Sequence, residues 1–218
     1  RLFEGADGAT VVHAAGVIHP ATHVRQMFDV NVGGTQMVLD RARRAGVGRL
    51  VHISSNSPYG ANERPTDRFT EDSPPNPYLG YGRSKLEAEG LVSRATERGD
   101  VAGVILRPPW FYGPWSPPRQ AQFIAAIRKG RFPLVGDGCQ QRSMIHTRNL
   151  VQACLRAEVA PDAVGRAYWV ADARPYELRA ILAGVREAAM AEGLEVSRRG
   201  PIRFPRLGAA VAARLDGA

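Results

Sequence analysis

A tyrosine and a lysine four residues apart are the side chains of this sequence best suited to acid–base chemistry. Tyr81 and Lys85 stand in the segment Tyr-Gly-Arg-Ser-Lys, and on a helix this spacing puts both side chains on one face. A phenol has a pKa of about 10, so it transfers protons readily at neutral pH only when its phenolate is stabilised. A nearby lysine cation can do this, and the pair can then move a proton to or from an alcohol or ketone oxygen. Because the chain has only two lysines, a chance match is uncommon.

Two serines follow an apolar run that is typical of a buried parallel strand. The run Arg49–Ile53 leads directly into Ser54 and Ser55, and α/β proteins bind their ligands at the carboxyl ends of strands. We therefore expect the Ser55 hydroxyl to hydrogen-bond the reacting oxygen of a substrate. A role in a turn or cap is the alternative for such a pair.

Apolar runs and helical patterns alternate along the rest of the chain. Strands are predicted at 10–15, 49–54, 101–106, 132–135, 144–146 and 167–171, and helices at 21–45, 84–98, 118–129, 147–157 and 176–192. This alternation predicts an α/β fold, a Rossmann-like parallel sheet with flanking helices. A composition change near Pro114–Pro118 predicts two domains, 1–115 and 116–218. The second would be a small mixed α/β substrate-binding lobe, with a late strand that can return to the main sheet.

Composition excludes several classes of protein. The chain has 218 residues, 44% hydrophobic and 23% charged, as in ordinary globular proteins. The net charge of +8 is spread along the chain without a nucleic-acid-binding signature, so we expect no nucleic-acid partner. No apolar stretch is long enough for a membrane span. Two unpatterned cysteines favour a reduced, cytoplasmic protein, and five dispersed histidines predict no metal site.

Several short motifs occur in a characteristic order. They are His13-Ala14-Ala15-Gly16, Asn31-Val32-Gly33-Gly34-Thr35, Ser55, the Tyr81/Lys85 pair, Arg107-Pro108-Pro109-Trp110-Phe111-Tyr112-Gly113-Pro114, and Gly136-Asp137-Gly138 followed by Arg142 and Ile145-His146. In this order they resemble the extended short-chain dehydrogenase/reductase family, in its NAD-dependent epimerase/dehydratase branch. The resemblance covers roughly residues 6–172.

The resemblance implies an enzyme that moves hydride between NAD or NADP and a secondary alcohol or ketone carbon of a small molecule. Tyr81 would be the acid/base, Lys85 would lower its pKa and contact the nicotinamide ribose, and Ser55 would hold the substrate oxygen. The residues implied to contact the cofactor are His13, Ala14, Ala15, Asn31, Ser54, Tyr81, Lys85 and Pro108.

The substrate signals point in two directions. Arg142 matches the place where nucleotide-sugar enzymes of this family use an arginine on a phosphate. Trp110 stands where those enzymes often carry asparagine, and it looks more like the 3β-hydroxysteroid dehydrogenase branch with its apolar alcohols. The neighbours of Ser55, Asn56 and Ser57, carry no acid, which favours epimerisation or oxidation over dehydration. A nucleotide-sugar-like substrate is slightly preferred, and a non-catalytic dinucleotide-binding relative is a further alternative.

One part of the family pattern has no counterpart in this sequence. The family opens with a strand, a Gly-x-x-Gly-x-x-Gly turn and a helix that binds the pyrophosphate, and no such pattern precedes His13. We therefore expect the chain to be a piece of a longer protein, with an uncovered strand edge near Thr10. The predicted helices from Ala21 and Ser84 could also pair across a two-fold axis in a homodimer.

Overall fold

The computed structural model describes residues 3–18, 24–62, 64, 66–77, 79–115 and 118–204. The chain separates into two compact units, one of residues 1–111 with 145–171 and the other of residues 112–144 with 172–218. The expected boundary was at residue 115, with a late strand that could return to the main sheet. The segment 145–171 belongs to the first unit and contains such a strand, Ala167–Trp169. Each unit is described on its own below.

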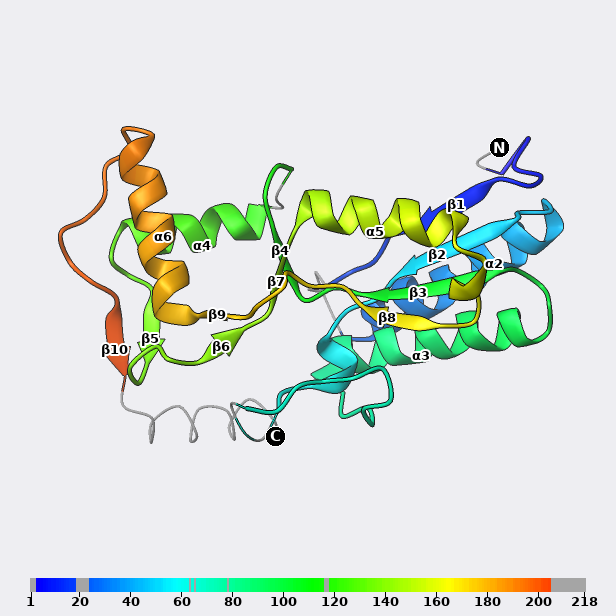
Figure 1. The fold of residues 1–218 in the computed structure, drawn as a ribbon, viewed down its shortest axis with the longest axis horizontal. Helices are drawn as coiled ribbons and strands as arrows, with labels where there is room; N and C mark the ends of the chain where they lie inside the picture. Colours follow the sequence, from blue (N-terminus) through cyan, green and yellow to red (C-terminus); the bar gives the residue numbers. More distant parts are fainter. Residues whose placement is uncertain are drawn as a thin grey trace. The chain divides into compact units, whose positions relative to one another are not determined.

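A four-stranded parallel sheet forms the centre of the first unit (Figure 1). Its strands are β1 (Thr10–His13), β2 (Arg49–Ile53), β3 (Gly103–Arg107) and β8 (Ala167–Trp169), in the order β1-β2-β3-β8. The register pairs His13 with His52 and His52 with Ile105. The expected Rossmann-like α/β fold is therefore present. β1 lies at an edge of the described sheet, and its Val12 side chain is 49% exposed.

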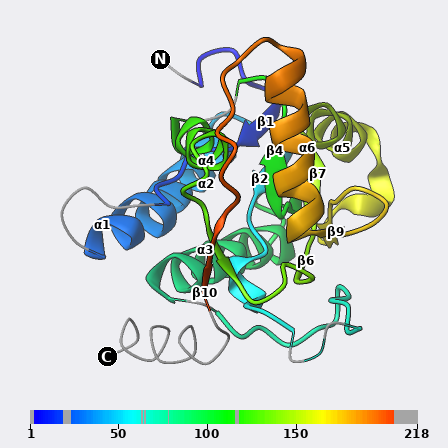
Figure 2. The same cartoon turned by 90° about the vertical axis from the view of Figure 1, so that its left-hand side faces the viewer.

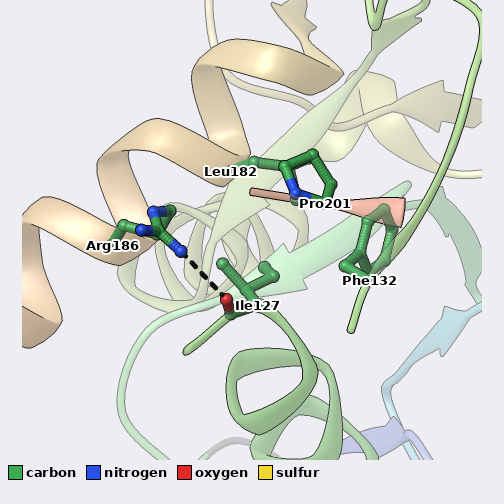
Figure 3. Close-up of a pocket in the computed structure, with 5 residues that line it drawn as sticks. All are labelled: Ile127, Phe132, Leu182, Arg186 and Pro201. Carbon is green, nitrogen blue, oxygen red and sulfur yellow. Dashed lines mark hydrogen bonds between the residues drawn. The ribbon is translucent and has the colours of Figure 1, made fainter. Parts of the chain in front are cut away.

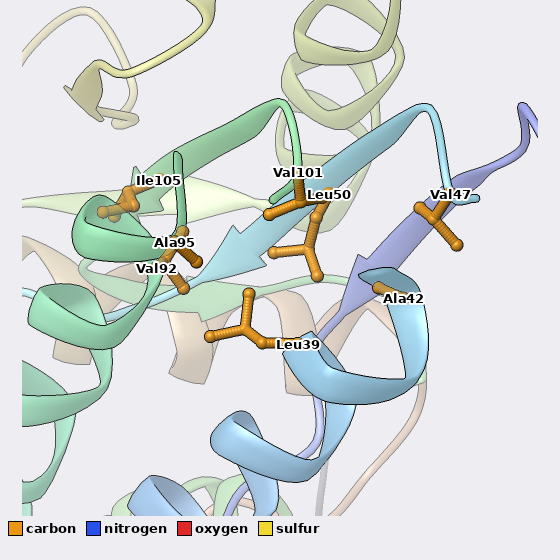
Figure 4. Close-up of a cluster of buried hydrophobic side chains, with 8 residues drawn as sticks. All are labelled: Leu39, Ala42, Val47, Leu50, Val92, Ala95, Val101 and Ile105. Atoms are coloured by element: carbon orange, nitrogen blue, oxygen red, sulfur yellow. The ribbon is translucent and has the colours of Figure 1, made fainter. Parts of the chain in front are cut away.

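Helices cover both faces of this sheet. Successive side chains of a strand point to opposite faces, so apolar residues on both faces need a covering layer. Leu50 and Ile105 pack against α2 (Gly34–Arg44) and α3 (Leu79–Glu97) on one face, in the cluster of buried side chains drawn in Figure 4. Val51 and Val104 point to the other face, where they pack against α5 (Thr147–Val159). Sheets buried on both faces are typical of parallel α/β proteins.

The helix predicted over 21–45 contains a π-helical turn. Its described part consists of α1 (Arg25–Phe28), the π turn η1 (Asp29–Gly33) and α2, which run as one continuous rod in Figure 2. Residues 21–23 lie outside the described part of the chain. π turns inside helices occur mostly at functional sites, and here the turn contains Asn31.

Helix α3 begins at Leu79, five residues before the predicted start at Ser84. Serine is a residue type that often caps the start of a helix. The Ser84 hydroxyl, however, donates to the Tyr81 carbonyl oxygen one turn earlier at 2.9 Å. That bond is typical of a serine inside a helix. Tyr81 and Lys85 therefore both lie on α3.

Short elements connect the strands of the first unit. A 3₁₀ turn, η2 (Ser57–Tyr59), follows β2, and another, η3 (Pro161–Ala163), precedes β8. The strands β4 (Trp110–Tyr112) and β7 (Met144–His146) form a separate two-stranded sheet. Of these short elements, only β7 was predicted.

The second unit has its own small core. Its elements are α4 (Pro118–Arg128), β5 (Pro133–Val135), β6 (Gln141–Arg142), β9 (Tyr176–Glu177), α6 (Leu178–Ala191) and β10 (Ile202–Phe204). Ile127, Leu134 and Leu182 are buried between them. The Arg186 side chain donates to the carbonyl oxygen of Ile127 at 3.4 Å beside a cavity of about 10 Å³ (Figure 3). Such a cavity has room for about one water molecule, so it holds no substrate. None of the helices in the described ranges is both long and apolar enough to cross a membrane.

Candidate active site

The carboxyl ends of β1, β2 and β3 lie at one edge of the sheet. The pairing of β2 with β3 continues past both strands, because the Ser54 N–H donates to the Leu106 carbonyl oxygen at 2.7 Å and the Asn56 N–H to that of Pro108 at 3.1 Å. Ala14 and Ala15 follow β1 and are exposed. The structure thus brings most of the sequence-predicted cofactor residues to the edge where α/β proteins bind ligands.

Ser55 has the turn role that was considered as the alternative for it. Its hydroxyl oxygen accepts a hydrogen bond from the Ser57 N–H at 3.2 Å, and the hydroxyl donates to the Ser57 side-chain oxygen at 3.1 Å. These contacts are those of a turn serine. The Ser55 hydroxyl also acts on the Tyr81 phenol, whose pKa it lowers as a hydrogen-bonding side chain. The turn therefore holds Ser55 against the tyrosine that the sequence predicts as its catalytic partner.

Gly82 allows helix α3 to approach this turn closely. A Cβ atom at this position would lie 2.5 Å from the carbonyl oxygen of Ser57. A side chain therefore does not fit between Tyr81 and Arg83, and only glycine permits this contact of helix with turn. The glycine inside the Tyr81/Lys85 motif is thus a requirement of the geometry.

The pKa of the Tyr81 phenol is raised above its ordinary value. Burial is the larger cause, and the hydrogen bond with Ser55 acts in the opposite direction. The expectation was that Lys85 lowers the pKa of Tyr81. The described contacts of the Lys85 ammonium are instead with His52 and Ile53 of β2. Tyr81 is therefore a neutral phenol at neutral pH, and burial makes it a weaker acid than an ordinary phenol.

Lys85 is almost completely buried, with 4% of its surface exposed. Its ammonium donates to the carbonyl oxygen of Ile53 at 2.8 Å, and its Nζ lies 3.4 Å from His52 Nε2. Burial lowers the pKa of Lys85 to about 8, although the Glu89 carboxylate acts in the opposite direction. At neutral pH the side chain is still mainly a cation.

Two buried histidines lie beneath Lys85. The His13 and His52 rings face each other at 5.2 Å between centroids. The Thr35 hydroxyl donates to the carbonyl oxygen of Asn31, so its oxygen accepts from His13 Nε2 at 2.9 Å. Burial and the Lys85 charge lower the pKa of His13 to about 4, and the pKa of His52 is lowered by the same two causes. Both rings are therefore neutral at pH 7, and His13 is a packed side chain below the exposed strand end.

Asn31 holds the segment after β1 in place. Its amide donates to the Val17 carbonyl oxygen at 2.9 Å and to the Ser84 hydroxyl at 3.0 Å, and its side-chain oxygen accepts from the Val17 N–H at 2.7 Å. Both amide hydrogens are thus used within the protein. Asn31, predicted as a cofactor contact, instead connects the strand end to helix α3.

Ser54 likewise points into the protein. It is 5% exposed, and its hydroxyl donates to Glu89 Oε1 at 2.5 Å. Arg107 forms a buried ion pair with the same carboxylate, with 2.8 Å between Arg107 Nη2 and Glu89 Oε2. Neither Glu89 nor Arg107 was predicted as a site residue. The available signal was the spacing of Glu89, which lies four residues after Lys85 and eight after Tyr81 on the same helix.

Two of the three predicted substrate residues, Trp110 and Arg142, belong to different units. Trp110 is partly exposed in β4 of the first unit, and Arg142 is exposed in β6 of the second unit, opposite Tyr176 in β9. Pro108, another predicted cofactor residue, is buried after β3. Among the residues that the structure describes, no three histidine, cysteine, aspartate or glutamate side chains gather as a metal site.

The sequence and the fold of the chain both match known proteins of one family. The NAD dependent epimerase/dehydratase family matches residues 1–171, and the chain belongs to it. The uncharacterized protein y4nL of Sinorhizobium fredii (strain NBRC 101917 / NGR234) is 41% identical over 97% of this chain and 60% of that protein. A 4-hydroxy-2-methyl-3-oxo-4-farnesyl-3,4-dihydroquinoline-1-oxide ketoreductase of Stigmatella aurantiaca is 35% identical over 83% of this chain and 54% of its own length. The chain thus spans between about half and three fifths of these relatives.

Solved structures show the same fold. MoeE5 in complex with UDP-glucuronic acid and NAD is 26% identical and has a TM-score of 0.74, covering 97% of this chain and 75% of that one. DesIV, a dTDP-glucose 4,6-dehydratase from Streptomyces venezuelae with NAD and TYD bound, is 24% identical and has a TM-score of 0.75, with 94% and 63% covered. The resemblance derived from the motifs is therefore confirmed, and the family is NAD(P)-dependent.

The described residues fit the nicotinamide end of such a cofactor. Gly16, after the exposed Ala14 and Ala15, lies against the Asn31 side chain, where an added Cβ would be 3.1 Å from Asn31 Oδ1. Gly16 thus packs closely on Asn31, while Ala14 and Ala15 remain exposed, and the cationic Lys85 side chain suits a ribose hydroxyl. The glycine-rich turn for the pyrophosphate has no counterpart before β1 in this sequence.

Proposed function

We propose that this chain carries the catalytic residues of an NAD(P)-dependent oxidoreductase or epimerase that acts at a secondary alcohol or ketone carbon. The observation that supports this most directly is the bond between α3 and the end of β2, where the Lys85 ammonium binds the Ile53 carbonyl oxygen two residues before Ser55. Tyr81 lies four residues before Lys85 on the same helix. Serine, tyrosine and lysine are the residue types that the resemblance implies for the family's mechanism, and ligands of α/β proteins bind at the carboxyl ends of the strands.

Each protein group has a distinct part in the proposed reaction. Bound NAD(P) would supply or accept the hydride. Tyr81 donates its phenolic proton to the substrate oxygen during reduction and takes it back during oxidation. The Ser55 hydroxyl holds the same oxygen, and the Lys85 cation contacts the cofactor ribose. Of the three ammonium hydrogens of Lys85, the contacts with Ile53 and His52 use two and leave one for the cofactor ribose.

We favour reduction of a ketone as the first half-reaction. Tyr81 is protonated at neutral pH, as the acid of a reduction must be, although its raised pKa makes it a weaker acid than an ordinary phenol. The ketoreductase of Stigmatella aurantiaca, 35% identical, supports this direction. Asn56 and Ser57, which flank Ser55, are neutral, and this favours reduction or epimerisation over dehydration.

For the substrate, we favour a nucleotide-sugar-like molecule. Arg142 is exposed and therefore available to a phosphate. The relatives include a dTDP-D-glucose 4,6-dehydratase of Mus musculus, 31% identical, and the structural neighbour MoeE5 binds UDP-glucuronic acid.

An apolar alcohol or ketone is the second candidate. Trp110 presents a partly exposed aromatic ring after β3, which suits an apolar substrate. The substrate named for the Stigmatella ketoreductase carries a farnesyl chain, and a 3beta-hydroxysteroid-dehydrogenase/decarboxylase of Arabidopsis thaliana is 28% identical.

An assay with two matched variants tests this proposal. The natural protein that contains this sequence is incubated with NADH or NADPH and a 4-keto nucleotide sugar or a 3-ketosteroid, and with NAD or NADP and the corresponding alcohols, while nicotinamide absorbance is followed. We expect turnover that falls by a factor of about 100 to 10,000 in Tyr81→Phe. Tyr168→Phe, the same change in β8, should keep full activity. Cofactor binding without turnover by the wild-type protein, on either class of substrate, would support the non-catalytic alternative instead.

A further inference from the structure

We propose that Glu89 is a positioning residue, which fixes the end of β2 that carries Ser55 against the helix that carries Tyr81. This inference rests on the proposed function of Ser55 and Tyr81. Glu89 itself is buried away from the exposed strand end, with 4% of its surface accessible. It would therefore act through the residues that it binds.

One carboxylate connects three elements of the first unit. Glu89 lies on α3 and accepts the hydroxyl of Ser54, which follows β2, at 2.5 Å. From β3, Arg107 donates to the same carboxylate through Nε, 3.1 Å from Oε2, and through Nη2, 2.8 Å from Oε2. Charged hydrogen bonds between buried groups are strong and directional. The helix and both strand ends are thereby held in one arrangement.

The same network reaches the other side of Ser55. Arg107 lies over the ring of Tyr59, with its Cζ 4.5 Å from the ring centroid. Tyr59 is buried in η2, the turn that contains Ser57. Glu89 binds Ser54 directly and holds Tyr59 through Arg107 by a cation–π contact. Ser55 therefore lies between two residues that depend on the same carboxylate.

Two hydrogen bonds set the register of α3 on the end of β2, from the Ser54 hydroxyl to Glu89 and from the Lys85 ammonium to the Ile53 carbonyl oxygen. Tyr81 lies one turn before Lys85, and the Ser55 hydroxyl lowers its pKa. The three helix residues are spaced four apart and share one face. Only Glu89 brings a negative charge to the end of β2, and that charge also raises the pKa of Lys85. Its loss would free the strand end to which Lys85 also binds.

If the Glu89–Arg107 ion pair were purely structural, its removal would lower the stability of the protein and leave the pKa of Tyr81 unchanged. A positioning role predicts more, because a displaced Ser55 weakens the hydrogen bond that opposes the rise in the Tyr81 pKa. The Tyr81 pKa therefore reports the position of Ser55. It can be measured without a known substrate.

Three variants separate these two roles. Ser54→Ala removes only the hydroxyl that connects β2 to Glu89 and leaves the ion pair intact, while Glu89→Gln removes the charge. Thr96→Val is the matched control, because Thr96 lies further along α3 and accepts a hydrogen bond from the Gly103 N–H at the start of β3. In protein with ¹³C-labelled tyrosine, the Tyr81 resonance is assigned by its absence in Tyr81→Phe and titrated by NMR.

We expect Ser54→Ala and Glu89→Gln to raise the Tyr81 pKa toward its value in Ser55→Ala, and Thr96→Val to leave it unchanged. With a substrate, kcat should fall roughly tenfold or more while KM changes little, since misplaced catalytic groups mainly affect the chemical step. An unchanged Tyr81 pKa in folded Ser54→Ala overturns the inference, as does an equal shift in Thr96→Val. Should Glu89→Gln fail to fold, Ser54→Ala decides the question. Wild-type protein without turnover refutes the proposed function alone, because the titration remains measurable.

Discussion

The Lys85 ammonium donates a 2.8 Å hydrogen bond to the carbonyl oxygen of Ile53, the last residue of β2. Through this bond, the helix that carries the tyrosine is attached to the strand that leads to Ser55. The bond also compensates in part for burial of the charge, since a buried ammonium needs acceptors. The compensation is incomplete, and burial lowers the pKa of Lys85 to about 8.

The low pKa of Lys85 is directly measurable because the chain has only one other lysine, Lys129, which is exposed. In protein labelled with ¹³C at the lysine ε-carbon, NMR should show two signals. We expect one to titrate with a midpoint near 8, and Lys129→Arg should leave that signal in place. A midpoint near the ordinary lysine value of about 10.4 for both signals would contradict the burial of this charge.

The same shift predicts how turnover depends on pH. The folded pKa lies below the ordinary value, so Lys85 loses its positive charge as the pH rises through about 8. Turnover and cofactor binding should therefore decrease above pH 8, which a pH profile of kcat/KM would show. Constant activity up to pH 10 would mean that the Lys85 charge has no part in the reaction.

Ser55→Ala should impair catalysis while leaving the fold intact. The change removes the hydrogen bond to Tyr81 and the proposed contact with the substrate oxygen. A lost hydrogen bond to a reacting group lowers kcat by a factor of about 100 to 1,000. Ser73→Ala removes a hydroxyl that serves only the exposed loop before α3, where the Thr70 N–H donates to it at 2.8 Å, and should have no effect on kcat. Equal kcat values for wild type and Ser55→Ala would leave Ser55 with a turn role only.

Gly82→Ala tests the close approach of α3 to the Ser57 turn. The new Cβ would lie 2.5 Å from a backbone oxygen, so helix and turn must separate. We expect a loss of about 1–3 kcal/mol in the free energy of unfolding, together with lower turnover. Gly34→Ala places the same methyl group on α2, where nothing lies within 4 Å. That variant should be unchanged or more stable by up to about 1 kcal/mol, because alanine favours the helix. Denaturant unfolding of both variants makes the comparison.

Local patterns in the sequence were sufficient for the framework of the site. Apolar runs predicted β1, β2 and β3, and with β2 the position of Ser55 after a strand, because strand periodicity is a local property. The helix predicted from Ser84 contained Lys85 but left Tyr81 outside. The start of α3 was less predictable. Serine often caps a helix, and the predicted helix starts at Ser84. Only the three-dimensional structure shows that its hydroxyl donates to the Tyr81 carbonyl oxygen within the helix and accepts a hydrogen bond from the Asn31 amide.

The contacts that position the site depend on residues far apart in the sequence. Glu89 and Arg107 are ordinary charged residues in a chain rich in arginine, and their pairing follows from the packing of α3 on β3. Ser54 and Asn31 were predicted to contact a cofactor, yet their hydrogen-bonding groups are turned to Glu89, Val17 and Ser84. A sequence motif identifies such residues but leaves open whether they contact the ligand or hold the residues that do.

Buried neutral histidines predict a loss of stability in mild acid. The pKa of His13 is about 4 in the folded protein and about 6.5 in an unfolded chain. Between these values the unfolded state binds more protons, so the contribution of His13 is complete above about pH 6.5 and is lost as the pH falls toward 4. One such group changes the free energy of unfolding by up to about 1.4 kcal/mol per pH unit.

His13→Gln keeps a donor for Thr35 but does not titrate. Denaturant unfolding between pH 7 and pH 4 should therefore show a smaller loss of stability for His13→Gln than for wild type. The remaining loss comes from His52, whose pKa is also lowered, and from titrations that both proteins share. Parallel curves for the two proteins would show that His13 does not resist protonation in the folded state.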